Sequence, residues 1–275
     1  MLTSRQAIWI GWGPELVFLY NDAYLPIIGG RHPQAMGQPT REVWREIWSI
    51  IAPMLSTAMT GDEGTYVESM RLIMERNGYR EETYYTFSYS PVPDDDGEVG
   101  GIICANTDDT QRSIGERQLT LLREISGRAA SARSWQDACE RACTALVTNP
   151  RDIPFALIYL SECEGGSLRL AGLCGIDGRH PAAHPGGDFS TPCPWPLEKA
   201  ARREITVVPD LAKRFSEPLP TGAWSEPPTQ AALVPLSIAG RSGLLVAALN
   251  PFRLFDENYQ NFLRIVGGQI AASVG

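Results

Sequence analysis

Three runs of strand-forming residues, separated by tight-turn signals, limit most strongly what this chain can fold into. The runs are 65–75, 79–91 and 99–105, with Asn77-Gly78 between the first two and the acidic turn 94–97 between the last two. Asn-Gly is a strong signal for a two-residue hairpin, because both residues adopt positive φ readily. The segment therefore predicts three antiparallel strands in chain order.

A helical stripe precedes these strands. Between residues 43 and 59 bulky apolar side chains recur at helical spacing, and Trp44 and Trp48 belong to this stripe. Aromatic stripes usually bury their area in a core, which is the first interpretation. The second interpretation is that the two tryptophans line a small apolar pocket in which a small ligand binds. The candidate pocket residues are Trp44, Trp48, Phe87 and Cys104.

The first 110 residues form one predicted unit. Two short apolar strands, at 7–10 and 16–20, come before the helical stripe, and the three antiparallel strands follow it. Strands and helices that are segregated along the chain in this way are typical of an α+β domain. We expect this domain to end near residue 110 and a helix to span residues 111–133.

The second half repeats this plan without repeating the sequence. It is predicted to start with a helix after Ser134 and to finish with a helix capped by Asp256. Residues 175–228 hold ten of the twenty-one prolines, which predicts a long loop with one short helix near 197–202. The predicted strands are 155–160, 167–174, 205–208, 231–238 and 243–249. The fold class is therefore α+β, with two antiparallel-sheet domains joined by a helix.

The net charge argues against two classes of partner. Lys and Arg number 24 against 32 Asp and Glu, which gives −8, so we expect no nucleic-acid partner and no membrane partner. The apolar run at 7–14 is far shorter than the ~20 residues of a membrane span and lacks the basic start of a signal peptide. Six cysteines without a Cys-x-x-Cys motif indicate reduced thiols and a cytoplasmic protein.

Three segments of the first 112 residues carry a family resemblance. They are the strand-to-helix passage at 16–24, the hairpin at 89–101 and the segment 107–112, which contains an Asp-x-Thr junction formed by Asp108 and Thr110. Together they resemble a PAS domain. Asp109, between the two junction residues, stands where that family usually has an apolar residue.

The second half and the domain order extend the resemblance. Residues 134–275 are similar in plan to a GAF domain. With the Trp-Gly-Pro-Glu-Leu opening at 12–16, this order resembles the N-terminal sensory region of bacterial hybrid sensor histidine kinases. The resemblance implies a PAS-like sensor domain at 1–110, a connecting signalling helix at 111–133 and a GAF-like domain at 134–275.

The function that the resemblance implies is signal relay. A small-molecule ligand or a partner acts on the sensor domain, the junction at Asp108 and Thr110 passes the change to the connecting helix, and a downstream kinase domain outside this chain responds. The chain itself is expected to catalyse no reaction. All three histidines precede proline, which disfavours the helical backbone of a phosphoacceptor, and the nucleotide-binding boxes of a kinase are missing.

Two alternative functions stay open. One is a small GAF-fold enzyme with a cysteine nucleophile, such as a methionine sulfoxide reductase, although the spacing of Cys163, Cys174 and Cys193 does not match that pattern. The other is a free-standing dimeric PAS–GAF adaptor. Loss of an activity on Cys→Ser substitution would favour the first, and a reading frame without a kinase domain after Gly275 would favour the second.

A homodimer is predicted from the connecting helix. Ile114, Leu121 and Ile125 form an apolar seam on this helix, and we assign them to neither sheet. Removing such a side chain from water is favourable by about 1.5–3 kcal/mol. We therefore expect two copies of the chain to pair in parallel along these helices.

No cofactor and no metal are expected. The PAS-like half lacks the Asn-Cys-Arg-Phe signature of flavin-binding light sensors, and its helical stripe has no histidine that could ligate haem. The triplet at 152–154 is similar to the Asp-Ile-Pro of bilin-binding GAF domains, but it directly precedes a strand and we interpret it as a turn. His180 and His184 have the spacing of a metal pair, but their prolines deny them a shared helical face.

The purified protein should therefore be colourless. Tryptophan and tyrosine account for its expected absorbance at 280 nm, and an absorption spectrum should show no band at visible wavelengths. A visible band that co-purifies in a fixed ratio to the chain would contradict this expectation.

Overall fold

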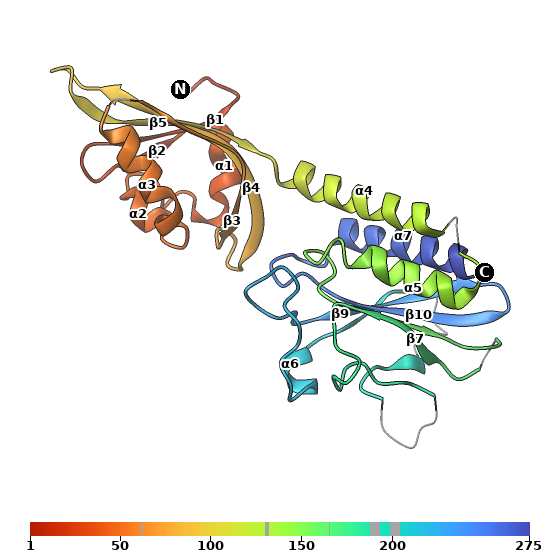
Figure 1. Cartoon of the computed structure of the whole chain (residues 1–275). Coiled ribbons are helices and arrows are strands. Elements are labelled where there is room, and N and C mark those ends of the chain that lie inside the picture. Colours follow the sequence, from red (N-terminus) through yellow and green to blue (C-terminus); the bar gives the residue numbers. More distant parts are fainter. Residues whose placement is uncertain (62, 130–131, 165, 188–192, 199–203) are drawn as a thin grey trace. The chain divides into compact units, whose positions relative to one another are not determined.

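The computed structural model describes residues 1–61, 63–129, 132–164, 166–187, 193–198 and 204–275. They form two units, Met1–Ile114 and Gly115–Gly275, which we call the N-terminal and the C-terminal domain (Figure 1). Each domain contains a five-stranded antiparallel sheet. The predicted α+β class with two antiparallel-sheet domains is thus confirmed.

The N-terminal domain combines its sheet with short helical segments, which follow the second strand and precede the third along the chain (Figure 1). The strand order is β2-β1-β5-β4-β3, so the three strands predicted from the turn signals pair as a meander and β1 closes against β5. Its strands are β1 (Ala7–Trp12), β2 (Val17–Tyr20), β3 (Thr65–Met74), β4 (Glu81–Pro93) and β5 (Val99–Asp108). Its helical segments are η1 (Asp22–Tyr24), α1 (Leu25–Ile28), η2 (Gly29–Arg31), α2 (Thr40–Val43) and α3 (Trp48–Met59).

The helix expected over residues 43–59 is present in two pieces. α2 ends at Val43 and α3 begins at Trp48, so the break precedes the position where Pro53 occurs within α3. In a continuous helix the carbonyl of Val43 would accept from the N–H of Ile47. Here Val43 accepts from the guanidinium of Arg31, and the N–H of Ile47 donates to Trp44 instead. The arginine therefore ends α2 and sets the position of Trp44.

The C-terminal domain has the same strand order, β7-β6-β10-β9-β8, with no detectable sequence repeat. Ser134 caps α5 and Asp256 caps α7, each by accepting from the backbone N–H three residues later, as the sequence predicts. Residues 199–202 of the short helix predicted near 197–202 lie outside the described residues. The strands are β6 (Ala156–Leu160), β7 (Arg169–Cys174), β8 (Thr206–Val208), β9 (Ala231–Ile238) and β10 (Arg241–Ala248). The helices are α4 (Thr110–Ala129, which starts in the N-terminal domain), α5 (Trp135–Leu146), α6 (Leu211–Arg214) and α7 (Glu257–Val274).

Both faces of the C-terminal sheet are buried. Successive residues of β10 point to opposite faces. Leu245 packs with α4, α5 and α7, whereas Leu244 packs in a second cluster with α6 and the proline-rich loop. The sheet is therefore the middle layer between a helical layer and a layer formed by α6 and described residues of the loop, among which Trp195 is buried.

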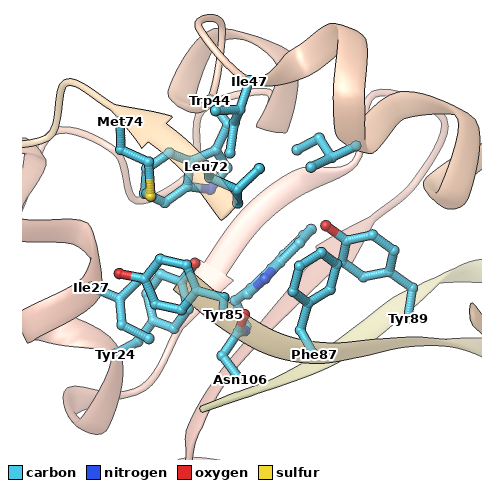
Figure 2. A pocket seen from close by; sticks show the side chains of 12 residues that line it. Tyr24, Ile27, Trp44, Ile47, Leu72, Met74, Tyr85, Phe87, Tyr89 and Asn106 are labelled. Carbon is cyan, nitrogen blue, oxygen red and sulfur yellow. The ribbon is translucent and has the colours of Figure 1, made fainter. Parts of the chain in front are cut away.

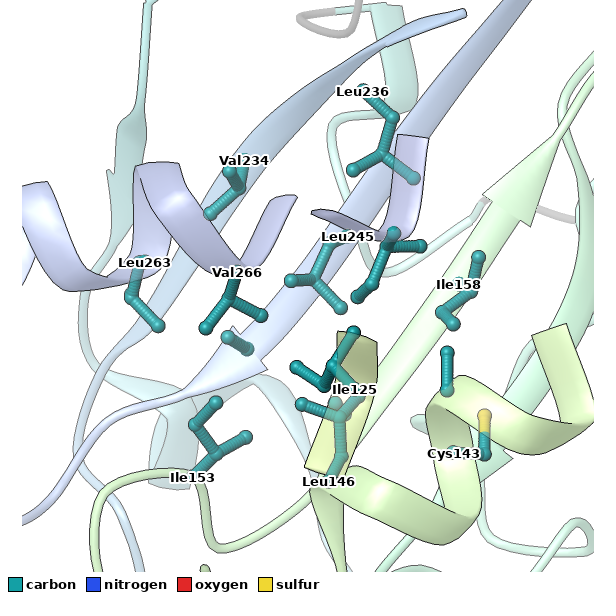
Figure 3. Packing of buried hydrophobic residues seen from close by; sticks show 14 of the residues in the cluster. Ile125, Cys143, Leu146, Ile153, Ile158, Val234, Leu236, Leu245, Leu263 and Val266 are labelled. Atoms are coloured by element: carbon teal, nitrogen blue, oxygen red, sulfur yellow. The ribbon is translucent and has the colours of Figure 1, made fainter. Parts of the chain in front are cut away.

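The predicted apolar seam of the connecting helix is buried within the chain itself. Leu121 and Ile125 of α4 are 0% and 1% exposed and belong to the core cluster of the C-terminal domain. Figure 3 shows Ile125 among Leu146 of α5, Val266 of α7 and residues of the sheet. Their assignment to neither sheet is wrong, because α4 packs with α5 and α7 on the sheet rather than standing in solvent.

This burial changes the argument for a homodimer. Ile114 is also buried, at 4% exposure. A seam that is already covered supplies no apolar area for a second copy. The homodimer stays a prediction, without the seam as its reason. Along α4 the observed helix covers Thr110–Ala129, and residues 130–131 of the predicted span lie outside the described residues.

No helix in the described part of the chain is both long enough and apolar enough to span a membrane.

The double substitution Leu121→Asp with Ile125→Asp should unfold the C-terminal domain. Each change places a carboxylate in an apolar core, where an unpaired charge costs several kcal/mol. Circular dichroism and light scattering of the variant would check this.

Leu119→Asp, at a 54% exposed position of the same helix, is the matched control and should leave the fold intact. A folded double variant with half the parent's mass would instead place the seam between two copies.

Candidate functional site

The N-terminal core contains a small internal cavity between its helices and its sheet. Its volume is about 30 Å³, and Figure 2 shows Trp44 and Ile47 on one side of it and Tyr85 and Phe87 of β4 on the other. The lining is mostly aromatic and aliphatic, with polar groups from tyrosines and one asparagine. The lining residues are Trp9, Tyr24, Ile27, Trp44, Ile47, Ile51, Leu72, Met74, Tyr85, Phe87, Tyr89 and Asn106.

Two of the four predicted pocket residues line this cavity. Trp44 and Phe87 do, and they are 3% and 4% exposed. Trp48, the first residue of α3, packs against the same core but is not part of the lining. Cys104 is fully buried, and its sulfur accepts a hydrogen bond at 3.1 Å from Asn106, which does line the cavity. Burial raises the pKa of the Cys104 thiol, so it stays protonated.

The cavity is too small for an organic ligand in this conformation. A single water molecule needs roughly 10–15 Å³ by the same kind of measure, whereas typical ligand pockets occupy about 300–1,000 Å³. The space observed can therefore hold one or two waters. Any larger molecule has to displace lining side chains to enter.

Two arginines contact residues that line the cavity. Arg31 lies over the ring of Trp44 at 4.9 Å and pairs with Glu46 at 2.7 Å. Arg76 pairs with Glu81 at 2.8 Å and donates to the backbone carbonyl of Ile27 at 3.1 Å. The two guanidinium groups therefore connect residues that line the cavity to other parts of the domain, and their hydrogen bonds to charged groups have a defined direction.

Tyr85 connects the cavity to the predicted junction. Its ring lines the space, its hydroxyl accepts from Arg76 at 2.6 Å and donates to Asp108 at 3.3 Å. The other carboxylate oxygen of Asp108 accepts from the backbone N–H of Thr110 at 2.9 Å, at the first residue of α4. Two hydrogen bonds thus lead from a cavity-lining side chain to the start of the helix. The predicted junction residues Asp108 and Thr110 are part of this path.

Asp109 forms a second connection at the same point. Its carboxylate accepts from the hydroxyl of Thr86 on β4, from Ser69 on β3 at 3.4 Å and from Arg112 on α4 at 3.0 Å. The hydrogen bond from Thr86, together with those from Arg112 and Ser69, lowers the pKa of Asp109. The Asp109 side chain is 9% exposed. It therefore joins two strands to the first turn of the helix as a carboxylate.

Ser69 reaches Asp109 because the strand is irregular there. The pairing of β3 with β4 shifts between Val67 and Met70, and Ser69 has a φ of 46°, which is uncommon for a residue other than glycine. Its backbone N–H donates to the hydroxyl of Thr86 at 3.0 Å, and its own hydroxyl accepts from Arg112 at 3.0 Å. The bulge thus turns a serine toward the helix start.

Further along the helix, within the C-terminal domain, Arg117 binds the loop before β6. Its guanidinium donates to both carboxylate oxygens of Asp152, at 2.9 and 2.6 Å, and Asp152 is 0% exposed. Asn149 donates to the same carboxylate at 2.8 Å. Residues 151–154 form a turn, as predicted, but its aspartate is a buried partner of the helix rather than a solvent-exposed turn residue.

The cysteines proposed for an alternative enzyme are not brought together. Cys174 belongs to the cluster on the helical face of the C-terminal sheet, whereas Cys193 packs against the cluster on the loop face. Cys163 is exposed in the loop after β6. Burial raises the pKa of Cys193, which disfavours the nucleophilic thiolate.

The histidine pair has structural roles. His180 Nδ1 accepts from the backbone of Ala182 at 3.0 Å, and His184 Nδ1 accepts from Gly186 at 3.1 Å, so both side chains stabilise turns. Within the described ranges, no cluster of three or more His, Cys, Asp or Glu side chains could hold a metal ion.

Comparison with known proteins identifies the first domain. The sequence model of the family described as PAS fold matches residues 2–114, which confirms the predicted PAS-like domain. The C-terminal domain has the predicted GAF-like plan of helix, antiparallel strands, long loop, strands and helix. The order of a PAS-like and a GAF-like domain is therefore confirmed at the level of the fold. No curated protein was found to match the chain.

Several solved structures resemble parts of the chain. One is the GAF domain of a phosphoenolpyruvate-protein phosphotransferase from Acinetobacter (21% identity, TM-score 0.40, 57% of this chain and 92% of that one). Another is the phytochrome photosensory core module of Stigmatella aurantiaca (13%, 0.40, 98% and 57%). A third is the free methionine-R-sulfoxide reductase from Neisseria meningitidis (18%, 0.39, 57% and 87%). Likeness at this level assigns no activity to the present chain.

Replacing Asp109 with Asn should destabilise the N-terminal domain at neutral pH and less so in acid. Hydrogen bonds to a charged group contribute about 1.5–3 kcal/mol each when buried, and with Arg112 half exposed we expect a total loss of about 1–2 kcal/mol. Because the folded state lowers the pKa of Asp109 below 3.8, its contribution is present above that pH and is lost as pH falls through the folded-state pKa. The difference in the free energy of unfolding between variant and parent should therefore be smaller at pH 3 than at pH 7.

Urea unfolding at both pH values would measure this difference. Asp95→Asn, at an exposed position of the β4–β5 turn, is the matched control and should have no effect at either pH. If the difference in the free energy of unfolding between variant and parent is the same at both pH values, Asp109 contributes no charge-dependent stability.

Proposed function

We propose that this chain is a sensory and signal-relay module, in which a small ligand or a partner that acts on the N-terminal core changes the start of α4. The observation that carries the proposal is the position of Tyr85. Its ring lines the cavity while its hydroxyl bonds Asp108, the residue that accepts from the first N–H of the helix. A displacement of this ring therefore changes the hydrogen bonding at the helix start.

The small cavity gives this relay a physical basis. A ligand larger than water fits only a conformation in which lining side chains have moved, so it binds that conformation more tightly and shifts the population toward it. Tyr85 is the lining residue whose movement breaks a bond at the junction. The closed cavity is then the unliganded state of the sensor.

α4 is the element that would carry the change onward. It is a continuous helix of 20 residues; Arg112 in its first turn bonds Asp109, and Arg117, five residues further on, bonds Asp152. A change in its first turn acts on a helix whose later residues, Leu121 and Ile125, are part of the C-terminal core. This supports relay through the helix rather than an independent role for each domain.

The output that we propose is a histidine kinase domain of the same protein, in a two-component system of the cytoplasm. The sequence resemblance of the domain order supports this, and the reading frame that follows the codon for Gly275 tests it. A kinase domain encoded there would support the proposal, and a stop codon would favour the dimeric adaptor. The separate positions of Cys174 and Cys193 make a cysteine-dependent enzyme the weaker alternative.

Trp44→Ala with added indole tests the relay through Tyr85. The substitution should cost about 3–5 kcal/mol of stability and leave a cavity that fits the deleted indole ring. Indole should then raise the melting temperature of the variant and change the hydrogen exchange of residues 108–114. In Trp44→Ala combined with Tyr85→Phe, indole should still stabilise the protein, but residues 108–114 should no longer respond.

Trp48→Ala is the matched control, because this tryptophan packs on the same core without lining the cavity. Indole should leave its exchange at residues 108–114 unchanged. An indole response that persists without the Tyr85 hydroxyl would overturn the proposed path.

A further inference from the structure

The buried carboxylate of Asp152 lies between two arginines but is hydrogen-bonded to one of them. Arg117 of α4 donates to both of its oxygens, at 2.9 and 2.6 Å. Arg253, in the segment between β10 and α7, approaches the same carboxylate with its Nη1, at 3.5 Å from Oδ1. That distance is an ion pair without a good hydrogen bond.

Arg253 is held close to this position by other groups. Its guanidinium lies over the ring of Tyr259, 4.4 Å from the centroid, and its Nη2 is 3.9 Å from Asp256. The side chain is 10% exposed, and Nη1 is buried without a hydrogen-bond partner among the described residues. A buried donor that makes no hydrogen bond is destabilising, so this arrangement needs a reason.

We propose that Arg253 is an alternative partner for Asp152. When Arg117 of α4 moves away from the Asp152 carboxylate, Arg253 forms the hydrogen-bonded ion pair with this carboxylate instead. A shift of well under 1 Å would bring Nη1 from 3.5 Å into the hydrogen-bonding range of about 2.7–3.2 Å. Removing one partner of a buried ion pair is normally strongly destabilising, because it leaves an unpaired charge in the core. Because Arg253 can replace Arg117, Asp152 keeps a cationic partner whether Arg117 is bound to it or has moved away.

The exchange would let the part of α4 around Arg117 move while Leu121 and Ile125 stay in the C-terminal core. The Asp152 loop keeps further bonds of its own, since Asn149 donates to the carboxylate at 2.8 Å and the hydroxyl of Tyr259 donates to the backbone carbonyl of Asp152. Only the bond to α4 has to change. The inference rests on the proposed function for its purpose, movement of α4, but the exchange is a property of the C-terminal domain alone.

Four full-length proteins test the exchange: the parent, Arg117→Met, Arg253→Met and the double variant. If Arg253 replaces Arg117, each single substitution lowers the melting temperature moderately, and the double variant loses clearly more than the sum of the two. If the losses simply add, Arg253 does not take over the carboxylate and the proposal is overturned. Arg128→Met, on the same helix but paired with Glu124 one turn away, is the control and should combine additively with Arg253→Met.

Hydrogen exchange of the single variant decides the matter even if the double variant does not fold. In Arg117→Met, residues 115–122 of α4 should exchange faster while residues 149–154 keep the protection of the parent. Equal loss of protection in both segments would mean that the aspartate has no second partner, and would overturn the proposal. Neither measurement involves the cavity, so a negative result with indole would reject the relay through Tyr85 and leave this test unaffected.

Discussion

The ion pair between Arg117 and Asp152 makes the connecting helix a part of the C-terminal domain. A carboxylate with no exposed surface is stable only with good partners, and a bidentate guanidinium is the geometry that best satisfies both of its oxygens. With this pair in place, Leu121 and Ile125 fall on the helical face of the C-terminal sheet and complete its core. The helix that leaves the PAS-like domain is consequently a structural layer of the next domain as well as the link to it.

Local signals were enough to predict the elements of the fold. The turn at 94–97 and the caps Ser134 and Asp256 each act within a few residues, and each is present in the structure. The chain also reverses at Asn77-Gly78, but the two-residue hairpin expected there is wrong, because the pairing of Met74 with Glu81 leaves six residues between β3 and β4. The Asp-x-Thr motif also coincides with the end of β5 at Asp108 and the start of α4 at Thr110. Such features need no knowledge of distant contacts.

Contacts between distant residues could not be predicted in this way. Arg117 and Asp152 are 35 residues apart, and nothing in either local sequence marks them as partners. The break of the helix before α3 depends on Arg31, 12 residues before Val43. For the seam on α4 the periodicity correctly showed an apolar stripe, but the stripe could not show whether it covers its own chain or a second copy. Asp109 is the exception, because its departure from the apolar residue usual in PAS domains was visible and marks the charged connection found there.

The continuity of α4 also constrains how this design can vary in length. Because an α-helix turns by about 100° per residue, one residue inserted between Arg112 and Arg117 would change the angle between their side chains about the helix axis by about 100°. Insertions of about seven residues, close to two full turns, come nearest to restoring their angular relation. Within α4, the number of residues between these two arginines therefore sets the angle between them about the helix axis.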